Sequence, residues 1–274
     1  MLKKAFIPVS LKEPEARMEE MAEYLGLLGT DTVCFCHIVE GVGGAEPDSN
    51  VHHALAQLEE LFKRHDFRVS TATGSGGIAS NVCRLAVEEE ADYIAIPWKR
   101  KNVIKRAILS SPDIDILRMC SFTTLIHKSR RYSGGDSGLS VVLYATDCKE
   151  ADKKVLPLLK RAPWPGSHLK FLHVRDRAPD PETDAKRERE MRIKMERLAE
   201  ACHGGFKSSR TELATGSIRR KIARVAKSSD AGLVIVGRNE KKKPLDNILG
   251  SNAESLPHRV NSSLLIVAEP PSGI

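Results

Sequence analysis

The stretch DAGLVIVG, residues 230–237, decides the fold of this 274-residue chain. Its four consecutive apolar residues, 233–236, predict a short strand that is buried on both faces, and Gly237 ends it. A polar segment follows to residue 247, then the sequence ILGS at 248–251, a short helical segment at 252–260 and a second apolar strand at 264–267. This order predicts two parallel strands joined by a helical crossover.

Gly250 and Ser251 lie where the polar segment reaches the helical one. Backbone N–H groups at the start of a helix are free to bind an anion, and the helix dipole favours negative charge there. The sequence therefore predicts a position for an anionic group, such as a phosphate, beyond the carboxyl end of the strand at 233–236.

Strands and helices alternate along the whole chain. We expect strands at 6–10, 32–39, 67–71, 93–96 and 123–126 in the first half, with helices at 12–28, 52–65 and 76–89. In the second half we expect strands at 141–146, 169–174, 206–213, 233–236 and 264–267, with helices at 150–161, 183–202 and 218–227. The predicted fold class is α/β, with two tandem doubly wound domains that each hold a five-stranded parallel sheet flanked by helices.

An internal repeat gives the domain boundaries. With an offset of 140, residues 76–128 align on 216–268 without a gap, and His37 and His173 occupy equivalent places in the second strand of each half. We therefore expect domains at 1–128 and 139–274, joined by a linker at 129–138. The linker contains SGGDS, which is similar to a pyrophosphate-binding loop but is one residue short and precedes a strand, so it favours a flexible connection.

The net charge of +7 is unevenly shared between the halves. Residues 1–128 carry 15 Lys and Arg against 18 Asp and Glu, whereas residues 139–274 carry 26 against 17. A basic second half is compatible with an anionic lipid, a phosphorylated ligand, nucleic acid or a solvated surface. Its cations are scattered over helices without interleaved aromatic residues, which does not favour nucleic acid.

The six cysteines show no disulfide-framework spacing, which favours a reducing cytoplasm. No apolar run approaches the roughly 20 residues of a membrane span, and the first residues lack a signal-peptide pattern. The sequence CFCH at 34–37 places both thiols on one face of a strand, and this favours a buried strand over a metal site. Cys148 borders the expected crevice, so a reactive thiol there stays an open alternative.

Gly237, Gly250 and Ser251 stand at the spacing of the signature G-x2-G-x9-G-[ST], and the chain resembles the universal stress protein family, once per half. The resemblance implies a Rossmann-like fold of the adenine nucleotide alpha hydrolase type and a nucleotide site in the second half. The residues it implies at that site are Asp147, Val174, Gly237, Arg238, Gly250, Ser251 and Asn252. No metal ligand of the protein is implied; Mg²⁺ would accompany ATP.

Glu240 departs from the signature, because it replaces the second glycine. Its side chain and charge oppose a nearby phosphate, so we expect weak binding; the alternative is a degenerate loop that binds nothing. The first half departs further, since Ser10, Pro97 and Ser110 replace Asp147, Gly237 and Gly250. Its loop has lost the phosphate contacts, and the basic residues at 99–101 either bind another anion or are solvated.

The resemblance implies a cytoplasmic stress-response or signalling protein that binds ATP or AMP and is not an enzyme. Two alternatives stay open: an interaction protein with both sites empty, and a slow ATP hydrolase using Glu240 or Asp246. We expect the two halves to pair through their last strands, 123–126 and 264–267, as family members commonly do when they dimerise. A homodimer and a protein partner of unknown identity are further expectations, and a membrane partner is not.

Overall fold

The computed structural model describes residues 2–39, 49–98, 112–129, 138–238 and 255–268. The described residues fall into two compact units, one for each half of the chain, and each unit is considered by itself. In the part of the chain that is described, no helix is both long and apolar enough to span a bilayer.

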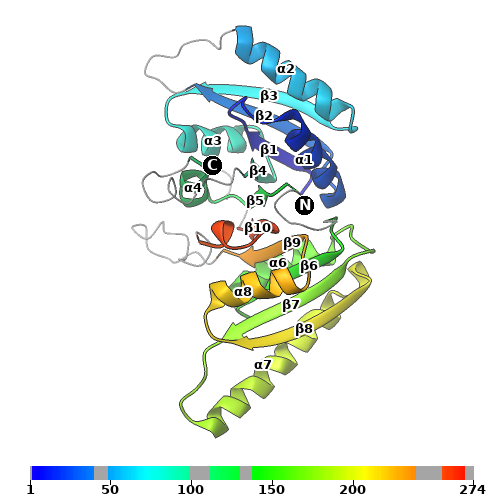
Figure 1. Cartoon of the computed structure of the whole chain (residues 1–274), viewed down its shortest axis with the longest axis vertical. Helices are drawn as coiled ribbons and strands as arrows, with labels where there is room; N and C mark the ends of the chain where they lie inside the picture. The colour runs from blue at the N-terminus through cyan, green and yellow to red at the C-terminus, as the bar shows by residue number, and fades with distance from the viewer. Residues whose placement is uncertain (1, 40–48, 99–111, 130–137, 239–254, 269–274) are drawn as a thin grey trace. The chain divides into compact units, whose positions relative to one another are not determined.

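The first half contains a parallel sheet in the order β3-β2-β1-β4-β5. Its strands are β1 (Lys4–Pro8), β2 (Thr32–Val39), β3 (Arg68–Ser75), β4 (Tyr93–Pro97) and β5 (Thr124–His127). Its helices are α1 (Glu15–Leu28), α2 (Ser49–Lys63), α3 (Ile78–Glu88) and α4 (Pro112–Met119). Figure 1 shows these helices on the two faces of the sheet.

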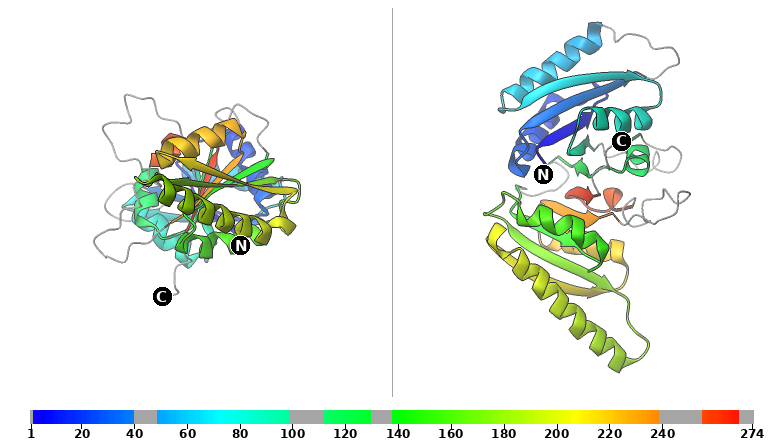
Figure 2. Two further views of the ribbon diagram at one scale, coloured as in Figure 1. Left: turned by 90° about the horizontal axis from the view of Figure 1, so that it is seen from below. Right: turned by 180° about the vertical axis from the view of Figure 1, so that it is seen from behind.

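The second half repeats this arrangement in the order β10-β9-β6-β7-β8, again with parallel pairing. Its strands are β6 (Val141–Ala145), β7 (His168–Arg175), β8 (Ser208–Thr215), β9 (Leu233–Gly237) and β10 (Ser263–Val267). Its helices are α6 (Glu150–Lys160), α7 (Pro181–Ala201) and α8 (Ile218–Ser228), with short 3₁₀ turns at His203–Gly205 and Leu256–His258. Figure 2 shows the helices of this half from two further directions. The doubly wound fold predicted from the sequence is confirmed.

The strand order positions the functional edge of each half. Right-handed crossovers place the helices after the first two strands on one face of the sheet, and the helix after the third strand on the other face. The chain therefore reverses direction at the first strand, β1 or β6. Parallel sheets leave a crevice at the carboxyl end of such a strand, because the flanking connections diverge there.

Burial follows the two kinds of strand. Every residue of β4 is buried, as the continuous apolar run at 93–97 requires for a strand covered on both faces. The edge strands β3 and β8 are more exposed, and many of their residues are polar. Buried aromatic rings pack in the core of the first half, where Phe35 and Phe62 meet edge to face with ring centroids 4.8 Å apart.

The internal repeat is also visible in the backbone. Gly76 and Gly216, 140 residues apart, both have a positive φ, 103° and 117°, where a side chain would be strained. Glu90 and Asp230 share the left-handed conformation at the same offset, and Leu11 and Cys148 share it in the loops after the first strands. Equivalent turns thus recur even where the residue types have diverged.

One helix was not expected from the sequence, and one expectation falls on residues that are not described. The sequence analysis placed no helix at 112–119, yet α4 lies there and buries Ile116 and Leu117; with only eight residues, its periodicity was too short to recognise. Most of the linker, residues 130–137, lies outside the described residues.

The cysteine spacing did not reveal the one disulfide that the described residues contain. Cys83 of α3 and Cys120, directly after α4, form a disulfide with their Cα atoms 5.3 Å apart. The pairing joins two helices that pack together on one face of the first-half sheet, so it follows from the fold and not from sequence spacing. The inference of a reducing compartment therefore loses its main premise. The other four cysteines are buried and free.

We predict that this disulfide stabilises the first half measurably. The bridge closes a loop with a sequence separation of 37, for which the loop-entropy model gives up to about 4 kcal/mol. Reductant should lower the free energy of unfolding of the parent chain in urea, but not that of Cys120→Ser. Cys202→Ser, a change at a buried free thiol, is the control and should keep the sensitivity to reductant. Equal stability of the parent with and without reductant would contradict the bond.

Candidate functional site

The carboxyl edge of the second-half sheet brings three of the predicted site residues together. Ala145, the last residue of β6, pairs with Leu172 of β7 on one side and Val236 of β9 on the other. Asp147 follows β6, while Val174 and Gly237 lie at or near the ends of the two flanking strands. The register therefore places these three residues around the point where the strand order reverses.

Backbone hydrogen bonds hold this edge in shape. The Thr146 N–H donates to the carbonyl of Leu172 at 2.9 Å, which extends the β6–β7 pairing by one residue toward Asp147. The Arg238 N–H donates to the carbonyl of Val267 at 2.7 Å and so extends the pairing of β9 with β10. Arg238, another predicted site residue, is therefore held in line directly after Gly237.

Asp147 has a local structural role. Its Oδ1 accepts a hydrogen bond from the Lys149 N–H at 3.0 Å, just before α6 begins. Cys148, between them, adopts a φ of 56°, the left-handed conformation that tight turns require. The Asp147 carboxylate is half-buried and is held by the turn in which it lies.

A buried polar cluster that the sequence analysis missed supports the loop carrying Asp147. The Asp152 carboxylate, on α6, accepts hydrogen bonds from the Tyr144 hydroxyl and the Thr146 hydroxyl, each at 2.5 Å. The Thr146 Oγ1 in turn accepts from the Cys148 N–H at 2.8 Å. In the first half the counterparts of Tyr144 and Thr146 are apolar, Ile7 and Val9, so this cluster belongs to the second half alone. Comparison of the two repeats is the signal that could have found it.

The same environment changes the chemistry of two side chains. Burial and the hydrogen bond to Asp152 raise the pKa of the Tyr144 hydroxyl well above its usual range. Burial also raises the pKa of the Cys148 thiol, which is 9 % exposed. A thiol is reactive as its thiolate, so this environment does not favour the reactive thiol left open from the sequence.

The equivalent histidines of the two halves make the same contact, as expected from the repeat. His173 Nδ1 lies 2.9 Å from the Thr146 carbonyl oxygen, and His37 Nδ1 lies 3.0 Å from the Val9 carbonyl oxygen. The neighbours of His37 behave as strand residues, because Cys34 and Cys36 are buried in β2 and burial raises the pKa of both thiols. The prediction of a buried strand at CFCH is confirmed.

Gly237 is required by packing within the protein. A Cβ atom on this residue would lie 2.4 Å from the Cβ of Ala151 and 3.3 Å from its Cα, too close for any real contact. Ala151 belongs to the first turn of α6. The glycine therefore allows α6 to approach the end of β9, whether or not a ligand also lies there.

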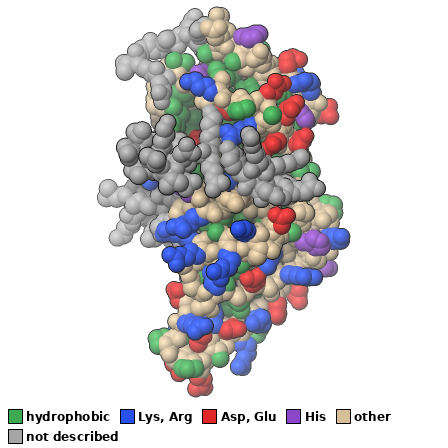
Figure 3. Space-filling view, viewed as in Figure 1, with side chains coloured by type: hydrophobic (Ala, Val, Ile, Leu, Met, Phe, Trp, Pro, Cys, Tyr) green, Lys and Arg blue, Asp and Glu red, His purple; other side chains and the backbone are tan. Residues whose placement is uncertain are grey.

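Basic side chains gather beside this edge. Helix α8 carries five cations and no acid, Arg219, Arg220, Lys221, Arg224 and Lys227. The first turn holds three of them, and its N-terminus faces the carboxyl edge because α8 follows the end of β8. Figure 3 shows Lys and Arg side chains gathered on this part of the second-half surface.

The matching helix in the first half provides an internal comparison. At the offset of 140, the first-turn residues of α3 are Ala79, Ser80 and Asn81, which carry no charge. Helix α3 has one cation, Arg84, and it is paired with Glu88 at 2.7 Å. Its counterpart Arg224 forms no ion pair with a described residue. The two carboxyl edges thus share a backbone and differ in charge.

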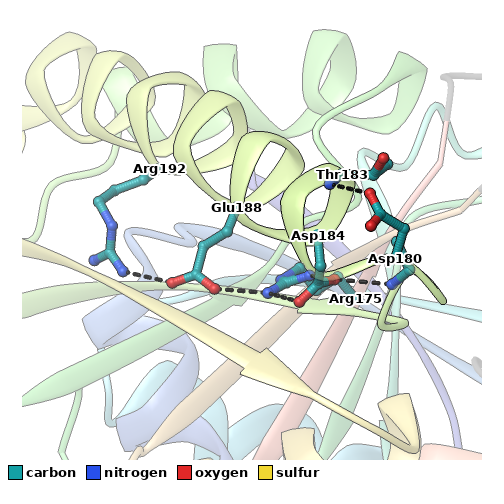
Figure 4. Close-up of polar contacts among 7 residues, drawn as sticks. Arg175, Asp180, Thr183, Asp184, Glu188 and Arg192 are labelled. Atoms are coloured by element: carbon teal, nitrogen blue, oxygen red, sulfur yellow. Dashed lines mark hydrogen bonds and ion pairs between the residues drawn. The ribbon is translucent and has the colours of Figure 1, made fainter.

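An ion-pair network at the end of β7 holds the start of α7, as Figure 4 shows. The Arg175 guanidinium donates to both carboxylate oxygens of Asp184 and, at 2.6 Å, to Glu188. Asp184 also accepts the Ala178 N–H at 2.8 Å. Two further contacts lie nearby. Asp180 caps α7 by accepting the Thr183 N–H at 2.7 Å, and Arg192 donates to Glu188 at 3.1 Å.

This network replaces apolar packing along half of the helix. The residues of α7 that face the sheet recur at helical spacing; Asp184 and Glu188 are the first of them, and the buried Met195 and Ala199 are the last. The apolar stripe of Met191, Met195, Leu198 and Cys202 covers only the second part. Arg175 therefore attaches the polar first part of α7 to the strand next to Val174.

The remaining predicted site residues lie outside the described part of the chain. These are Gly250, Ser251, Asn252 and the departure at Glu240, together with Asp246 and the basic residues at 99–101. Among the described residues, no group of three or more His, Cys, Asp or Glu side chains is arranged to hold a metal ion.

The first half shows that the equivalent positions surround one cleft. Ser10, Ile38 and Pro97, the counterparts of Asp147, Val174 and Gly237, all line a cleft of about 740 Å³ at the carboxyl edge of the first-half sheet. In the first half, a cleft therefore lies at the strand-order reversal, where parallel sheets leave a crevice.

Comparison with known proteins finds a family match for the second half and a similar fold for the whole chain. Residues 139–268 match the model of the Universal stress protein family. The whole chain is similar to a universal stress protein from Archaeoglobus fulgidus, with a TM-score of 0.70 and 15% identity over 99% of this chain and 98% of that one. No curated protein sequence matches the chain.

Two further solved structures are similar over nearly the full length. One is a putative universal stress protein from Pseudomonas aeruginosa, with a TM-score of 0.69 and 18% identity over 97% of this chain and 93% of that one. The other is the cytoplasmic domain of a prokaryotic cation chloride cotransporter, with a TM-score of 0.51 and 11% identity over 98% and 96%. At these identities the likeness concerns the fold.

We predict that Gly237→Ala destabilises the second half by roughly 1–3 kcal/mol, because its Cβ would overlap Ala151. Ala151→Gly removes the atom it would meet. A double-mutant cycle by urea unfolding should show this coupling. The loss of unfolding free energy in the double variant should be smaller than the sum of the losses in the two single variants. Additive effects would show that α6 moves aside freely and that packing does not select the glycine.

We predict that Arg175→Met releases the first part of α7. Hydrogen exchange should become faster at 181–190, while 195–201 stays protected by the buried Met195 and Ala199. Arg192→Met, which removes only an exposed partner of Glu188, is the control and should have little effect.

The same contact should depend on pH. The Arg175 guanidinium, followed by the Ala178 N–H, holds the pKa of Asp184 below its usual range. A carboxyl whose pKa is lowered by folding stabilises the folded form above its ordinary pKa, near 4, and loses that effect as pH falls through the folded value. The parent should therefore lose protection at 181–190 below about pH 4. Arg175→Met should show no such loss, and an identical acid response in both chains would contradict the assignment.

Proposed function

Because residues 139–268 are a domain of the universal stress protein family, we propose that the second half binds an adenine nucleotide, ATP or AMP, at its carboxyl edge. The protein then acts in stress response or signalling, with nucleotide occupancy changing its conformation or its binding to a partner. The observation that carries the proposal is the strand register that places Asp147, Val174 and Gly237 around the reversal of strand order.

Electrostatics supports the choice of the second half. The first turn of α8 adds Arg219, Arg220 and Lys221 to the edge where the phosphates of a nucleotide would lie, and the N-terminus of the helix adds its own positive potential. Opposite charge raises both the local concentration and the affinity of a polyphosphate. The signature residues Gly250, Ser251 and Asn252 would hold the phosphates as the family resemblance implies, and Mg²⁺ would accompany ATP.

A second candidate is an interaction protein with both sites empty. The observation that favours it is the contact of Gly237 with Ala151, which explains the first signature glycine without any ligand. Mass spectrometry of small molecules released on denaturing freshly purified protein separates the two candidates. A released adenine nucleotide supports the first, and its absence together with no binding of added ATP supports the second.

We propose that the chain is a nucleotide-binding protein and not an enzyme. The rival slow ATP hydrolase needs a base or a metal-binding carboxylate beside the phosphates, and its candidates Glu240 and Asp246 lie outside the described residues. Turnover of ATP by the parent chain that is lost in Glu240→Gln or Asp246→Asn would favour the hydrolase.

A cytoplasmic location and pairing of the two halves also belong to the proposal. In a reducing cytoplasm the bond between Cys83 and Cys120 would form only on oxidation, so the redox state of these thiols in freshly lysed cells bears on the compartment. Pairing through the last strand of each half rests on the family resemblance and the apolar sequences of β5 and β10.

We predict that exchanging the first turn of α8 for that of α3 weakens ATP binding. Replacing Arg219, Arg220 and Lys221 by Ala, Ser and Asn removes three cations beside the phosphates. Calorimetry at low salt should then show at least about a tenfold loss of affinity, since each charge contributes on the order of 1 kcal/mol at close range in water. The difference should shrink as salt is raised, because solvent-open charges are screened.

The matched control removes three cations from the exposed side of α7. Lys186→Gln, Arg187→Gln and Arg189→Gln change the net charge by the same amount away from the edge. This control should bind ATP like the parent. Equal affinities of all three proteins would exclude the α8 turn from the site.

A further inference from the structure

The cleft in the first half differs in its lining from a nucleotide site. It measures about 740 Å³, within the range of pockets that hold small organic ligands. It opens at the ends of β1, β2 and β4, and α2, α3 and α4 contribute its remaining walls. Most of its surface is made by apolar side chains, among them Val9, Ile38, Val51, Ile78, Val82 and Ile116.

The charged groups of the cleft oppose an anion. Glu13 and Asp113 line it together with one cation, Lys12. The Glu13 carboxylate is held in place, because it accepts hydrogen bonds from the Ser10 N–H, the Ser10 hydroxyl at 2.6 Å and the Lys12 N–H. Among the described residues that line the cleft, acids therefore outnumber cations by two to one, whereas the first turn of α8 in the second half carries three cations and no acid.

Pro97 removes a further means of binding phosphate. It occupies the position of Gly237 at the end of β4, is buried, and lines the cleft. Proline has no N–H to donate and adds an apolar ring where a signature loop needs bare backbone. The lining thus changes from one suited to anions to one suited to apolar groups at the same place in the fold.

His37 supplies one oriented polar atom. Its Nδ1 lies 3.0 Å from the Val9 carbonyl oxygen, which can only accept, so Nδ1 carries the proton. In the neutral ring Nε2 is then an acceptor, and no hydrogen bond of Nε2 to a described residue is recorded. His37 is one of the residues that line the cleft, where its ring can accept a hydrogen bond from a ligand.

From the apolar walls, the opposing charges and the His37 acceptor, we propose that the first half binds an uncharged, mainly apolar small molecule with a hydrogen-bond donor directed at His37. The site would be distinct from the nucleotide site of the second half, and it does not depend on the proposed function. One chain would then respond to two ligands of different chemistry through two copies of one fold.

The test uses N-phenyl-1-naphthylamine, an uncharged aromatic amine with one N–H whose fluorescence rises in apolar surroundings. The full-length parent should bind one equivalent with a saturable fluorescence increase. Ala54→Phe places a ring in the cleft from α2 and should weaken binding at least tenfold. Ala185→Phe, the same change on the exposed side of α7, should leave binding unchanged.

Two further measurements keep the test decisive if Ala54→Phe folds poorly. In nitrogen-15 spectra of the parent, the probe should shift the resonance of His37 Nε2 more than that of His173. Millimolar ATP should not displace the probe. The proposal is overturned if the parent does not bind the probe, if a folded Ala54→Phe binds it like the parent, if His37 does not respond, or if ATP competes.

Discussion

The reversal of strand order at the first strand of each half is the constraint on which every proposed site depends. Because β1 and β6 each lie between strands whose connections leave in opposite directions, the backbone opens beside their carboxyl ends. The register then determines which residues face that opening: Asp147, Val174 and Gly237 in one half, and Ser10, Ile38 and Pro97 in the other. The strand pairing and the helices packed on each sheet hold these strand ends in place.

The two repeats show what duplication preserves and what it lets change. Backbone features are kept, including the positive φ of Gly76 and Gly216 and the contact of each histidine with the loop after the first strand. Side-chain chemistry at the edge is not kept. The second half has a buried carboxylate cluster around Asp152 and a basic turn on α8, while the first has Pro97, apolar walls and a disulfide. The two edges therefore differ in side-chain chemistry on an equivalent backbone.

The sequence predicted the fold well because its central strands are short apolar runs and residues 76–128 repeat without a gap at 216–268. The order of parallel strands also predicted that Asp147, Val174 and Gly237 lie at one edge, since parallel strands bring their carboxyl ends together. It could not predict contacts between side chains from different elements. The Cys83–Cys120 bond, the Asp152 cluster and the Arg175 network all join residues whose proximity depends on helix packing. The close approach of Ala151, which requires a glycine at position 237, likewise depends on the three-dimensional packing of α6.

The central claim is that the edges of the two halves have diverged, so that only the second accepts a nucleotide. Hydrogen exchange of the full chain, measured with and without saturating ATP, tests this most directly. The account predicts slower exchange at 146–150 and 216–221 of the second half, and no change at 9–13 and 37–39 of the first. Protection of the first-half segments by ATP, or no protection in either half, would contradict it.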